Sequence, residues 1–501
     1  MRAHRNGMPS KTRKFVVCPG FGPKHNLGVL HNNVDALERA LVERYFLCKD
    51  GNKFRPALIA SRSSFRTDTL ARFREKVCSS MPRLPRLTRQ QVVDRYNGPK
   101  RRVYENALRS LSRAPITIDD AQLTSFVKFA KQDVSKAGRV INPRSPRYNL
   151  SLACYLKHAE HHYFTAINKA FGARTRATVI KGFNADDSAS IIHDKWSLFL
   201  DPVAIGLDAN KFDMHVSILA LLYEHSFYKR LFPGSRMLRL LLKWQLRNKG
   251  VGYCKDGSVK FKMNGTRSSG DINTSLGNCI IMCALIHSFA ADFGIDLELC
   301  NNGDDCVVIM ERKDVDTFVS CVESWFRHKG FAMVVEKPVD IFERIDFCQT
   351  RPVLLSTGYR MIRNHKTVLE KDPMCLLPIP NNVVYRKWLD AVGTCGGILN
   401  NGVPVQQSFY DAFKRHGTPA SAGMVEAVYK NSSMAGRIKG LRENIITPAS
   451  RVSYYYAFGV TPDLQKELEL YYDELKILDY DPDQFVERED LALEPGLIVA
   501  V

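Results

Sequence analysis

The sequence predicts an α+β fold built on a small antiparallel sheet, and three observations lead to this prediction. A short apolar strand, Pro202–Leu207, ends at Asp208 and is followed by a helical pattern. A turn rich in glycine and serine at 265–270 leads into a long helical run. Two apolar runs, Leu297–Cys300 and Cys306–Met310, flank an Asn-Gly turn, and a helix, a strand and a second hairpin follow. This order of elements is typical of helices packed on a small antiparallel sheet.

Composition allows a large folded body with a polyanionic partner. The chain has 501 residues, of which 45% are hydrophobic, enough for one enzyme-sized body or two to four subdomains. The formal net charge is +20, yet the last 31 residues, Tyr471–Val501, hold nine acidic and two basic side chains, so the first 470 carry +27. A basic body of this size favours nucleic acid or an anionic membrane surface, with an ordinary basic surface as the alternative.

Cysteine usage and apolar runs argue against secretion and against a membrane span. The 13 cysteines are spread singly and form no C-x-x-C pair, which disfavours ribbon-type zinc sites and suits a reducing compartment. Cys279 and Cys283, one helical turn apart, are expected to be buried thiols. No signal peptide is visible, and the longest apolar run, Cys279–Ile295, is interrupted by His287 and Asp292. We judge it too short to cross a bilayer and expect no transmembrane segment in this chain.

The N-terminal part begins with a basic segment, Met1–Arg13, that reads as a flexible arm. Val34–Phe46 repeats apolar residues at helical spacing, and Asn32 or Asn33 is positioned to cap the helix.

A basic segment, Lys136–Tyr148, reads KAGRVINPRSPRY. Its prolines favour an extended loop that presents Arg139, Arg144 and Arg147. Guanidinium groups match phosphate oxygens bidentately, so this loop is suited to holding phosphates. A surface loop with incidental arginines is the alternative.

Two acidic residues mark the strand at Pro202–Leu207. Asp208 stands at its C-terminal end, where a carboxylate is available to a ligand. Asp213 follows five residues later at the start of a helix, where it would either face a substrate or cap the helix.

The stretch Gly265–Met282 combines a flexible entry with a polar helix face. After the Ser-Ser-Gly turn, Thr274 and Asn278 lie four residues apart and share one face of the helix. We expect this helix to lie along a polar ligand, and a solvent-exposed polar face is the alternative.

The hairpin at 297–310 would place Asp304 and Asp305 side by side at its tip. Adjacent carboxylates repel each other, and near a core they are costly without a neutralising cation. A hard divalent ion, which takes oxygen ligands, is the natural companion, with Asp208 on a neighbouring strand as a further ligand.

The remaining chain continues the pattern and then becomes helical. Val315–Gly330 reads as an amphipathic helix, Phe331–Val335 as a strand and Ile345–Leu355 as another hairpin. Beyond Asp372 the patterns are mostly helical and indicate a separate subdomain.

Six motifs, in order and at polymerase spacing, resemble viral RNA-dependent RNA polymerases, most closely those of the tombusvirus-like plant viruses (carmovirus- or umbravirus-like). DANKFD (208–213) is similar to motif A, SGDINTSLGN (269–278) to motif B and GDD (303–305) to motif C. KAGRVINPRSPRYN (136–149) resembles the basic motif F, VEKP (335–338) motif D and DFCQT (346–350) the motif E hairpin. HNN (31–33) resembles part of the fingers region of that group.

The resemblance implies a two-metal nucleotidyl transfer from NTPs to a 3′-OH, copying viral genomic RNA and releasing pyrophosphate. Asp208 and Asp304 would be the principal ligands for Mg²⁺, with Mn²⁺ as a substitute, and Asp305 would assist. Lys337 is the candidate general acid for pyrophosphate, with an ordinary surface lysine as the alternative.

The resemblance also assigns nucleotide-binding positions. Asp213 and Asn278, helped by Thr274, would read the ribose 2′-OH. Ser269 and Gly270 would form the flexible loop that contacts the templating position. Arg139 would hold the incoming triphosphate, with Arg144 and Arg147 as secondary candidates.

The implied architecture is a closed right hand with fingers, palm and a mostly helical thumb. Residues 1–190 would form the fingers, with an insertion at 236–264. Residues 191–235 and 265–370 would form the palm, and residues 371–501 the thumb and acidic tail. The tail would either compete with RNA for the basic body or be a disordered chain end, and we favour the second.

The expected partners are an RNA template and product, NTPs and a viral auxiliary replicase protein. Relatives usually carry an N-terminal replicase region that binds membrane, so either that region is missing from this chain or the polymerase is encoded differently. We expect the protein to act in the host cytoplasm, at membrane-associated replication complexes. It would be recruited to them by a partner or by that N-terminal region.

Two other functions compete with this interpretation. A reverse transcriptase shares the palm and the paired aspartates, but it usually has an aromatic residue where Asn302 stands, and Asn278 favours ribonucleotides. A non-enzymatic RNA-binding factor with a degenerate palm would tolerate loss of Asp208 or Asp304, and both are present.

Overall fold

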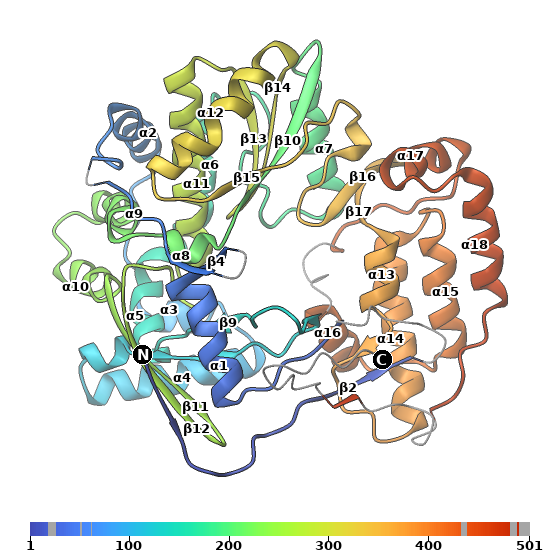
Figure 1. Cartoon of the computed structure of the whole chain (residues 1–501), viewed down its shortest axis with the longest axis horizontal. Helices are drawn as coiled ribbons and strands as arrows, with labels where there is room; N and C mark the ends of the chain where they lie inside the picture. Colours follow the sequence, from blue (N-terminus) through green and yellow to red (C-terminus); the bar gives the residue numbers. More distant parts are fainter. Residues whose placement is uncertain (19–26, 51–52, 62, 432–437, 481–487, 490–501) are drawn as a thin grey trace.

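The computed structural model describes residues 1–18, 27–50, 53–61, 63–431, 438–480 and 488–489 of the chain. Its elements follow one another around a ring (Figure 1). Most of the N-terminal half lies on the left of this view, the central sheet at the top and the C-terminal helices on the right, while α7 (Ala185–Trp196) lies beside the sheet and β2 (Lys14–Val17) near the C-terminal helices.

The central sheet is antiparallel and has the strand order β13-β14-β10-β15. Its strands are β10 (Pro202–Ala209), β13 (Leu297–Asn302), β14 (Asp305–Glu311) and β15 (Met333–Val335). The predicted α+β class and the small antiparallel sheet are therefore confirmed.

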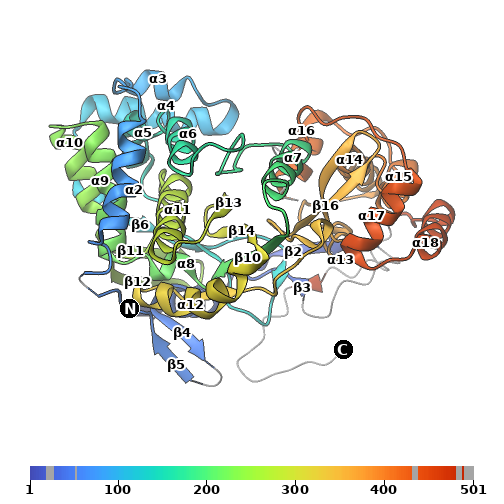
Figure 2. The ribbon, with the colours of Figure 1, turned by 90° about the horizontal axis from the view of Figure 1, so that it is seen from above.

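Helices cover both faces of this sheet (Figure 2). Ile205 and Val308 pack in a core with α11 (Thr274–Phe293), whereas Ala204 and Ile309 pack in a second core with α7 (Ala185–Trp196). Successive side chains of a strand point to opposite faces, so burial on both faces explains why β10 and β14 carry uninterrupted apolar runs, Val203–Leu207 and Cys306–Met310.

Most helices of the N-terminal half, α1 (Val34–Leu41) and α7 excepted, share one large core with the helices of the sheet's first face, and it includes Phe73, Tyr163 and Phe227. These helices are α2 (Asp68–Ser79), α3 (Arg89–Val93), α4 (Gly98–Arg113), α5 (Pro146–Leu156), α6 (Glu160–Ala170), α8 (Phe212–His215), α9 (Ile218–Leu231), α10 (Arg236–Trp244) and α12 (Val315–His328).

A second sheet corrects the prediction of a flexible N-terminal arm. Its order is β1-β12-β11-β6, with strands β1 (Arg2–Arg5), β6 (Leu123–Thr124), β11 (Arg247–Cys254) and β12 (Gly257–Asn264). The basic segment 2–5 pairs along the edge of β12, from Arg2 opposite Lys260 to Arg5 opposite Gly257. Its backbone hydrogen bonds hold it in place although its side chains are charged.

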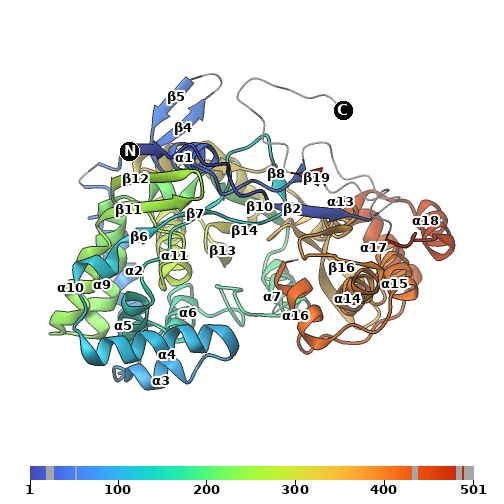
Figure 3. The same cartoon turned by 90° about the horizontal axis from the view of Figure 1, so that it is seen from below.

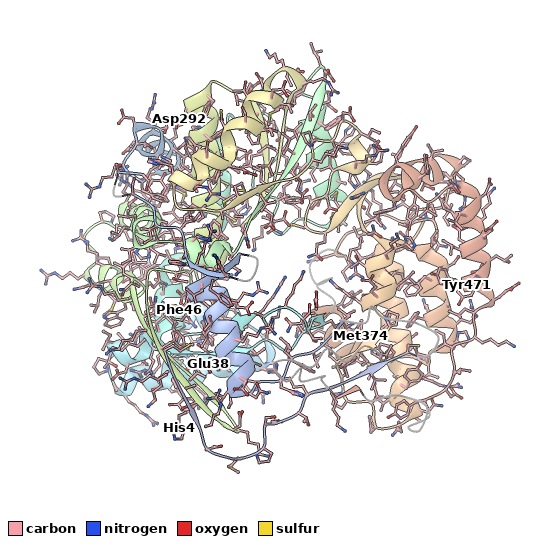
Figure 4. All side chains as sticks on the ribbon, viewed as in Figure 1. His4, Glu38, Phe46, Asp292, Met374 and Tyr471 are labelled. Carbon is pink, nitrogen blue, oxygen red and sulfur yellow. The ribbon has the colours of Figure 1, made fainter. Side chains whose placement is uncertain are left out.

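The predicted N-terminal helix is present but ends in a wider turn. Helix α1 (Val34–Leu41) is capped by Asn33, whose Oδ1 accepts a hydrogen bond of 2.7 Å from the Ala36 amide. It continues as the π-helical turn η1 (Val42–Phe46), and the Phe46 ring, labelled in Figure 4, meets Phe261 edge-on at 6.4 Å. Such turns shift the side chains that follow to a new face of the helix.

Three two-stranded pairs complete the N-terminal half. They are β3 (Leu27–Gly28) with β8 (Gln132–Asp133), β4 (Leu47–Asp50) with β5 (Lys53–Pro56), and β7 (Phe126–Val127) with β9 (Val140–Ile141).

The C-terminal part has its own core around Tyr385, Trp388 and Phe409. This core also includes Val353 and Ile362, which the predicted boundaries place in the palm. Its elements are β16 (Thr350–Leu355), β17 (Gly358–Arg363), α13 (His365–Lys371), β18 (Met374–Cys375), α14 (Asn382–Asn400), α15 (Gln406–His416), α16 (Ala422–Asn431), α17 (Pro448–Phe458) and α18 (Pro462–Glu474).

One strand, β2 (Lys14–Val17), joins the two ends of the ring (Figure 3). It pairs with β18 through Val17 opposite Met374, a residue labelled in Figure 4. It also pairs with β19 (Arg488–Glu489) from the acidic tail. The tail prediction is therefore wrong for residues 488–489, while 481–487 and 490–501 lie outside the described residues.

Helix α11 corrects one expectation about membranes. It is 20 residues long and is the one helix among the described residues that is long and apolar enough to cross a bilayer. Most of it is buried, and a core helix passes the same test. Cys279 and Cys283 on this helix are buried, as predicted.

His287 on α11 gives a prediction for the stability of this core. Its ring lies 5.1 Å from that of Phe73, and burial, with Lys76 nearby, lowers its pKa to about 4. In the unfolded chain the imidazole binds a proton below about pH 6.5. The folded state binds it only near pH 4, so acidification between these values favours unfolding. Relative to His287→Leu, the wild-type free energy of unfolding should fall by roughly 1.4 kcal/mol per pH unit from pH 6 to 4.5.

Urea unfolding at pH 7, 6, 5 and 4.5 measures this difference. If the free energy of unfolding changed with pH by the same amount in the wild type and in the leucine variant, the prediction would be contradicted.

Candidate active site

The hairpin of β13 and β14 is closed by a two-residue turn, Gly303-Asp304, one position later than the predicted Asn-Gly turn. Asn302 pairs with Asp305, and Gly303 has a φ of +86°, which glycine adopts without strain. Asn301 is buried and holds the turn instead of forming it. Its Nδ2 donates to the Gly303 carbonyl at 2.7 Å, and its Oδ1 accepts from the Gly303 amide at 3.2 Å.

Asp208 on β10 stands directly opposite Asp305 on β14. Opposite residues of an antiparallel pair project to the same face with their Cβ atoms about 5 Å apart. Asp304 lies in the adjoining turn. The register places Asp208 opposite Asp305 and next to the turn that carries Asp304, and the shared metal site stays a prediction.

The electrostatics around Asp304 and Asp305 are unfavourable without a cation. Asp208 and Asp304 remain open to solvent, but the surrounding walls still raise the pKa of Asp304, and the nearby charges of Asp213 and Asp208 add to this. Burial first, with Asp304 and Asp346 contributing, raises the pKa of Asp305 to about 6. At Asp304, the charge of Arg139 acts in the opposite direction and lowers the pKa, but the pKa stays raised.

The donor set fits a hard divalent ion by its chemistry. Mg²⁺ and Mn²⁺ take carboxylate oxygens, and an ion would offset the mutual repulsion of Asp208, Asp304 and Asp305. In the part of the chain that the structure describes, no three histidine, cysteine or acidic side chains already converge on one point. The argument for an ion therefore rests on charge and donor type.

A cavity of about 760 Å³ opens in front of Asp208 and Asp304. The other predicted residues that line it are Arg139, Asp213 and Ser269. A neighbouring cavity of about 500 Å³ shares part of this wall and is strongly basic. The basic residues common to both cavities are Arg44, Lys128, Lys136 and Arg139.

Arg139 is the arginine of the basic segment that reaches this site. It lines both cavities, and its charge lowers the pKa of Asp304, opposing the raising effects there. The carboxylates of Asp208 and Asp304 line the same cavity and could bind an ion. The Arg139 guanidinium could then hold a phosphate chain close to that ion.

Arg144 does not reach the cavities, which corrects its assignment to nucleotide binding. It is buried, and its guanidinium donates to Asp271 at 2.5 and 3.2 Å, to the Ala121 carbonyl at 2.6 Å and to Asn248 at 2.7 Å. Arg147 is likewise engaged, with Asp120 at 2.8 Å among its partners. Both arginines stabilise the fold.

The Ser269-Gly270 loop is clamped between the basic segment and Asp213. The Asn142 amide donates to the Ser269 carbonyl at 2.7 Å, and the Ser269 hydroxyl donates to the Asp213 carboxylate. Gly270 has a φ of +131°, and a Cβ there would lie 2.9 Å from the Pro143 nitrogen. Only glycine fits this close approach of two chain segments.

Asp213 and Asn278 face each other. Asn278 Nδ2 donates to Asp213 Oδ1 at 3.3 Å, so Asp213 is turned towards the site and does not cap α8. Burial raises the pKa of Asp213. The Thr274 hydroxyl instead donates to the Ser268 carbonyl at 2.9 Å, so Thr274 supports the loop and makes no hydrogen bond to Asp213 or Asn278.

Lys337 is not brought to the site. It lies in the exposed segment after β15 and lines neither cavity. The placement agrees with the alternative of a surface lysine and gives no support to a general acid at this position.

Two contributions were missed by sequence reasoning. Tyr45 belongs to the predicted helical run Val34–Phe46, but it lies in the π turn and lines the cavity of about 760 Å³, where its hydroxyl donates to Ser269 Oγ at 3.3 Å. The DFCQT segment forms a tight turn with φ of 55° at Cys348 and 60° at Gln349. Asn302 donates to Cys348 Sγ at 3.0 Å, so this turn contacts the carboxylate hairpin.

The predicted hairpin at Ile345–Leu355 is shifted as well. The long hairpin is formed by β16 and β17, and the turn at Cys348 precedes it.

Comparisons with known proteins identify the family. A family model described as viral RNA dependent RNA polymerase matches residues 1–479. The chain is 42% identical to the RNA-directed RNA polymerase of tobacco necrosis virus (strain A) over 94% of its length, 38% identical to that of tomato bushy stunt virus (strain Cherry) over 99%, and 40% identical to that of Cymbidium ringspot virus over 93%. It covers 65%, 59% and 56% of these relatives' own lengths. The resemblance read from the six motifs is thus confirmed, and the chain belongs to the viral RNA-dependent RNA polymerase family.

Proposed function

We propose that this chain is an RNA-directed RNA polymerase that copies viral RNA by adding NTPs to an RNA 3′ end. The observation that carries the proposal is the cavity of about 760 Å³. It joins the carboxylates Asp208 and Asp304, the guanidinium of Arg139 and the Asp213–Ser269 pair in one space. Nucleotidyl transfer needs these chemical functions together.

Asp208, Asp304 and Asp305 would hold the divalent ions, Mg²⁺ or Mn²⁺. Such ions, when bound, favour deprotonation of the 3′-OH and stabilise the charge of the leaving pyrophosphate. Arg139 and the basic residues around it would hold the triphosphate in line for attack.

Asp213 and Asn278 would select the sugar. A carboxylate that accepts a hydrogen bond from the ribose 2′-OH loses that bond with a deoxyribonucleotide, and a buried acceptor is then left without its partner. The Ser269-Gly270 loop would border the templating base. These roles follow the assignments made from the sequence, with Arg144 and Lys337 removed.

The fingers, palm and thumb arrangement is part of the proposal. The central sheet with α7, α11 and α12 would be the palm, and the core around Tyr385 the thumb. The separate core around Tyr385 supports the division of thumb from palm, whereas the fingers helices share one core with the palm. The pairing of β2 with β18 supports a closed hand, and on this ground we assign residues 14–17 to the thumb side instead of the fingers. An auxiliary replicase protein and a place at membrane-bound replication complexes stay predictions from the resemblance.

Single-nucleotide incorporation on an RNA primer–template with Mg²⁺ tests the function. We expect the intact chain to add the templated NTP and to prefer it over the matching dNTP. Asn278→Ala should lower this preference by about tenfold, because it removes one hydrogen bond of the sugar site. Failure of the wild type to add any nucleotide, with a primer or de novo, would refute the proposal.

A further inference from the structure

Arg267 connects the two residues to which sugar selection is assigned. Its backbone N–H donates to the carbonyl oxygen of Asp213 at 2.8 Å. Its side-chain Nε donates to Oδ1 of Asn278 at 2.9 Å. One residue therefore holds Asp213 through the main chain and Asn278 through the side chain.

The contact with Arg267 fixes which way the Asn278 amide points. The amide has a donor end and an acceptor end, and the acceptor is engaged by the guanidinium. The donor, Nδ2, consequently faces Asp213 Oδ1 at 3.3 Å. A flipped amide would place its NH₂ group against a cation and its oxygen against a carboxylate, and both contacts would be repulsive.

Glu224 holds Arg267 in this position. Arg267 Nη2 donates to Glu224 Oε2 at 2.5 Å, and the side chains are 1% and 0% exposed. Glu224 Oε1 accepts further hydrogen bonds from Asn273 at 2.8 Å and from Tyr228 at 2.7 Å. Such bonds offset part of the cost of burying an ion pair. Among the described atoms, Arg267 Nη1 is the atom of this pair that is buried without a hydrogen-bond partner.

The helix that carries Asn278 is shaped to receive this pair. Gly277 precedes Asn278 on α11, and a Cβ at Gly277 would overlap the Glu224 carboxylate and the Arg267 guanidinium. The ion pair thus rests on the backbone of α11 next to Asn278.

We propose that Arg267, held by Glu224, is a positioning residue that sets the Asn278 amide for discrimination between ribo- and 2′-deoxyribonucleoside triphosphates. This inference rests on the proposed function and adds a residue that contacts no substrate. Its effect on the sugar passes through Asn278 and Asp213.

Arg267→Lys is the test variant. Lysine keeps the positive charge beside Glu224 but has one ammonium group, which cannot span both Glu224 and Asn278 as the guanidinium does. We expect the ratio of kcat/KM for NTP to that for dNTP to fall by about tenfold, as for loss of the Asn278 hydrogen bond itself. Single-nucleotide incorporation measures the ratio.

Arg144→Lys is the matched control. The Arg144–Asp271 pair is equally buried, at 1% and 3% exposure, and makes no contact with Asp213 or Asn278. This variant should keep the ratio within about twofold, whatever it does to stability.

A double-mutant cycle separates positioning from general damage. In an Asn278→Ala background, Arg267→Lys should leave the ratio unchanged, because the amide that it positions is gone. An Arg267→Lys protein that folds and keeps the wild-type ratio would overturn the inference, as would an equal loss in Arg144→Lys or an additive loss in the double variant.

If Arg267→Lys does not fold, Glu224→Gln replaces it in the same design, with an expected loss of roughly threefold. An unchanged ratio in that variant would also overturn the inference. Failure of the proposed function is recognised separately, since the wild type would then add no nucleotide.

Discussion

Asp304→Asn should lower the rate of nucleotide incorporation by about 10³-fold or more. Asparagine has the size of aspartate but lacks the negative charge that a divalent ion requires, and metal stabilisation of transition-state charge is worth several kcal/mol. Asp304 would help to hold the ion, which when bound would stabilise the charge that develops in nucleotidyl transfer, so the loss is expected to be large. Single-turnover incorporation with saturating NTP and Mg²⁺ measures the effect.

The same substitution should not destabilise the metal-free protein. Burial and the charges of Asp213 and Asp208 oppose ionisation of Asp304, so removing its charge relieves an unfavourable interaction. The thermal midpoint of Asp304→Asn without metal should equal or exceed that of the wild type. A loss of activity at unchanged or raised stability is the signature of a functional carboxylate.

Asp296→Asn is the control for this experiment. Asp296 precedes the far end of the same hairpin, is exposed and pairs with Arg174 at 2.9 Å. An exposed ion pair contributes little, so incorporation should stay within about twofold of wild type. Near wild-type incorporation by Asp304→Asn, or an equal loss in both variants, would contradict the assignment of Asp304.

The sheet and its carboxylates were predictable because their signals are local. The apolar run before Asp208 and the glycine between Asn302 and Asp304 each encode a strand end or a turn within a few residues. The exact turn was displaced by one position because buried Asn301 supports the turn with its side chain. The choice between an Asn-Gly turn and a Gly-Asp turn depends here on these side-chain hydrogen bonds. The turn propensities of the residues alone do not decide between the two.

The pairing of chain ends could not be read from the sequence. Arg2–Arg5 shows no apolar alternation, and its place on β12 depends on backbone hydrogen bonds with residues about 255 positions away. The same holds for β2 between β18 and β19. A strand that pairs at the edge of a sheet does so through its backbone, so its side-chain pattern gives little indication of the pairing.

The roles of the arginines were separated only by tertiary partners. Arg139 and Arg144 belong to one basic segment, and both looked suited to phosphate. Asp271 lies 127 residues after Arg144 in the sequence and draws it into the core. Arg139 forms no such ion pair with the described carboxylates and stays on the cavity wall. Likewise, nothing local marks Arg267 as a partner of Asn278.

Gly277→Ala should lower the free energy of unfolding by about 2–4 kcal/mol, and two opposing effects decide the sign. In a helix interior, alanine is favoured over glycine by about 1 kcal/mol. At Gly277, however, the new Cβ would overlap the buried Glu224 carboxylate and Arg267 guanidinium. Breaking a buried ion pair costs about 3–5 kcal/mol, so the loss exceeds the gain. Urea unfolding of the variant and the wild type measures the difference.

Gly397→Ala separates the two effects. Gly397 also lies inside a helix, α14, but none of the described atoms packed around that helix comes within 4 Å of the place that its Cβ would take. Alanine there should stabilise the protein by about 0.5–1 kcal/mol, because only the helix preference acts. If Gly277→Ala were as stable as Gly397→Ala, the Glu224–Arg267 pair would not rest on α11 as the structure has it. If Gly277→Ala folds with a displaced pair, it should also show the reduced preference for NTP over dNTP expected of Arg267→Lys, since the Asn278 amide would then lose the same support.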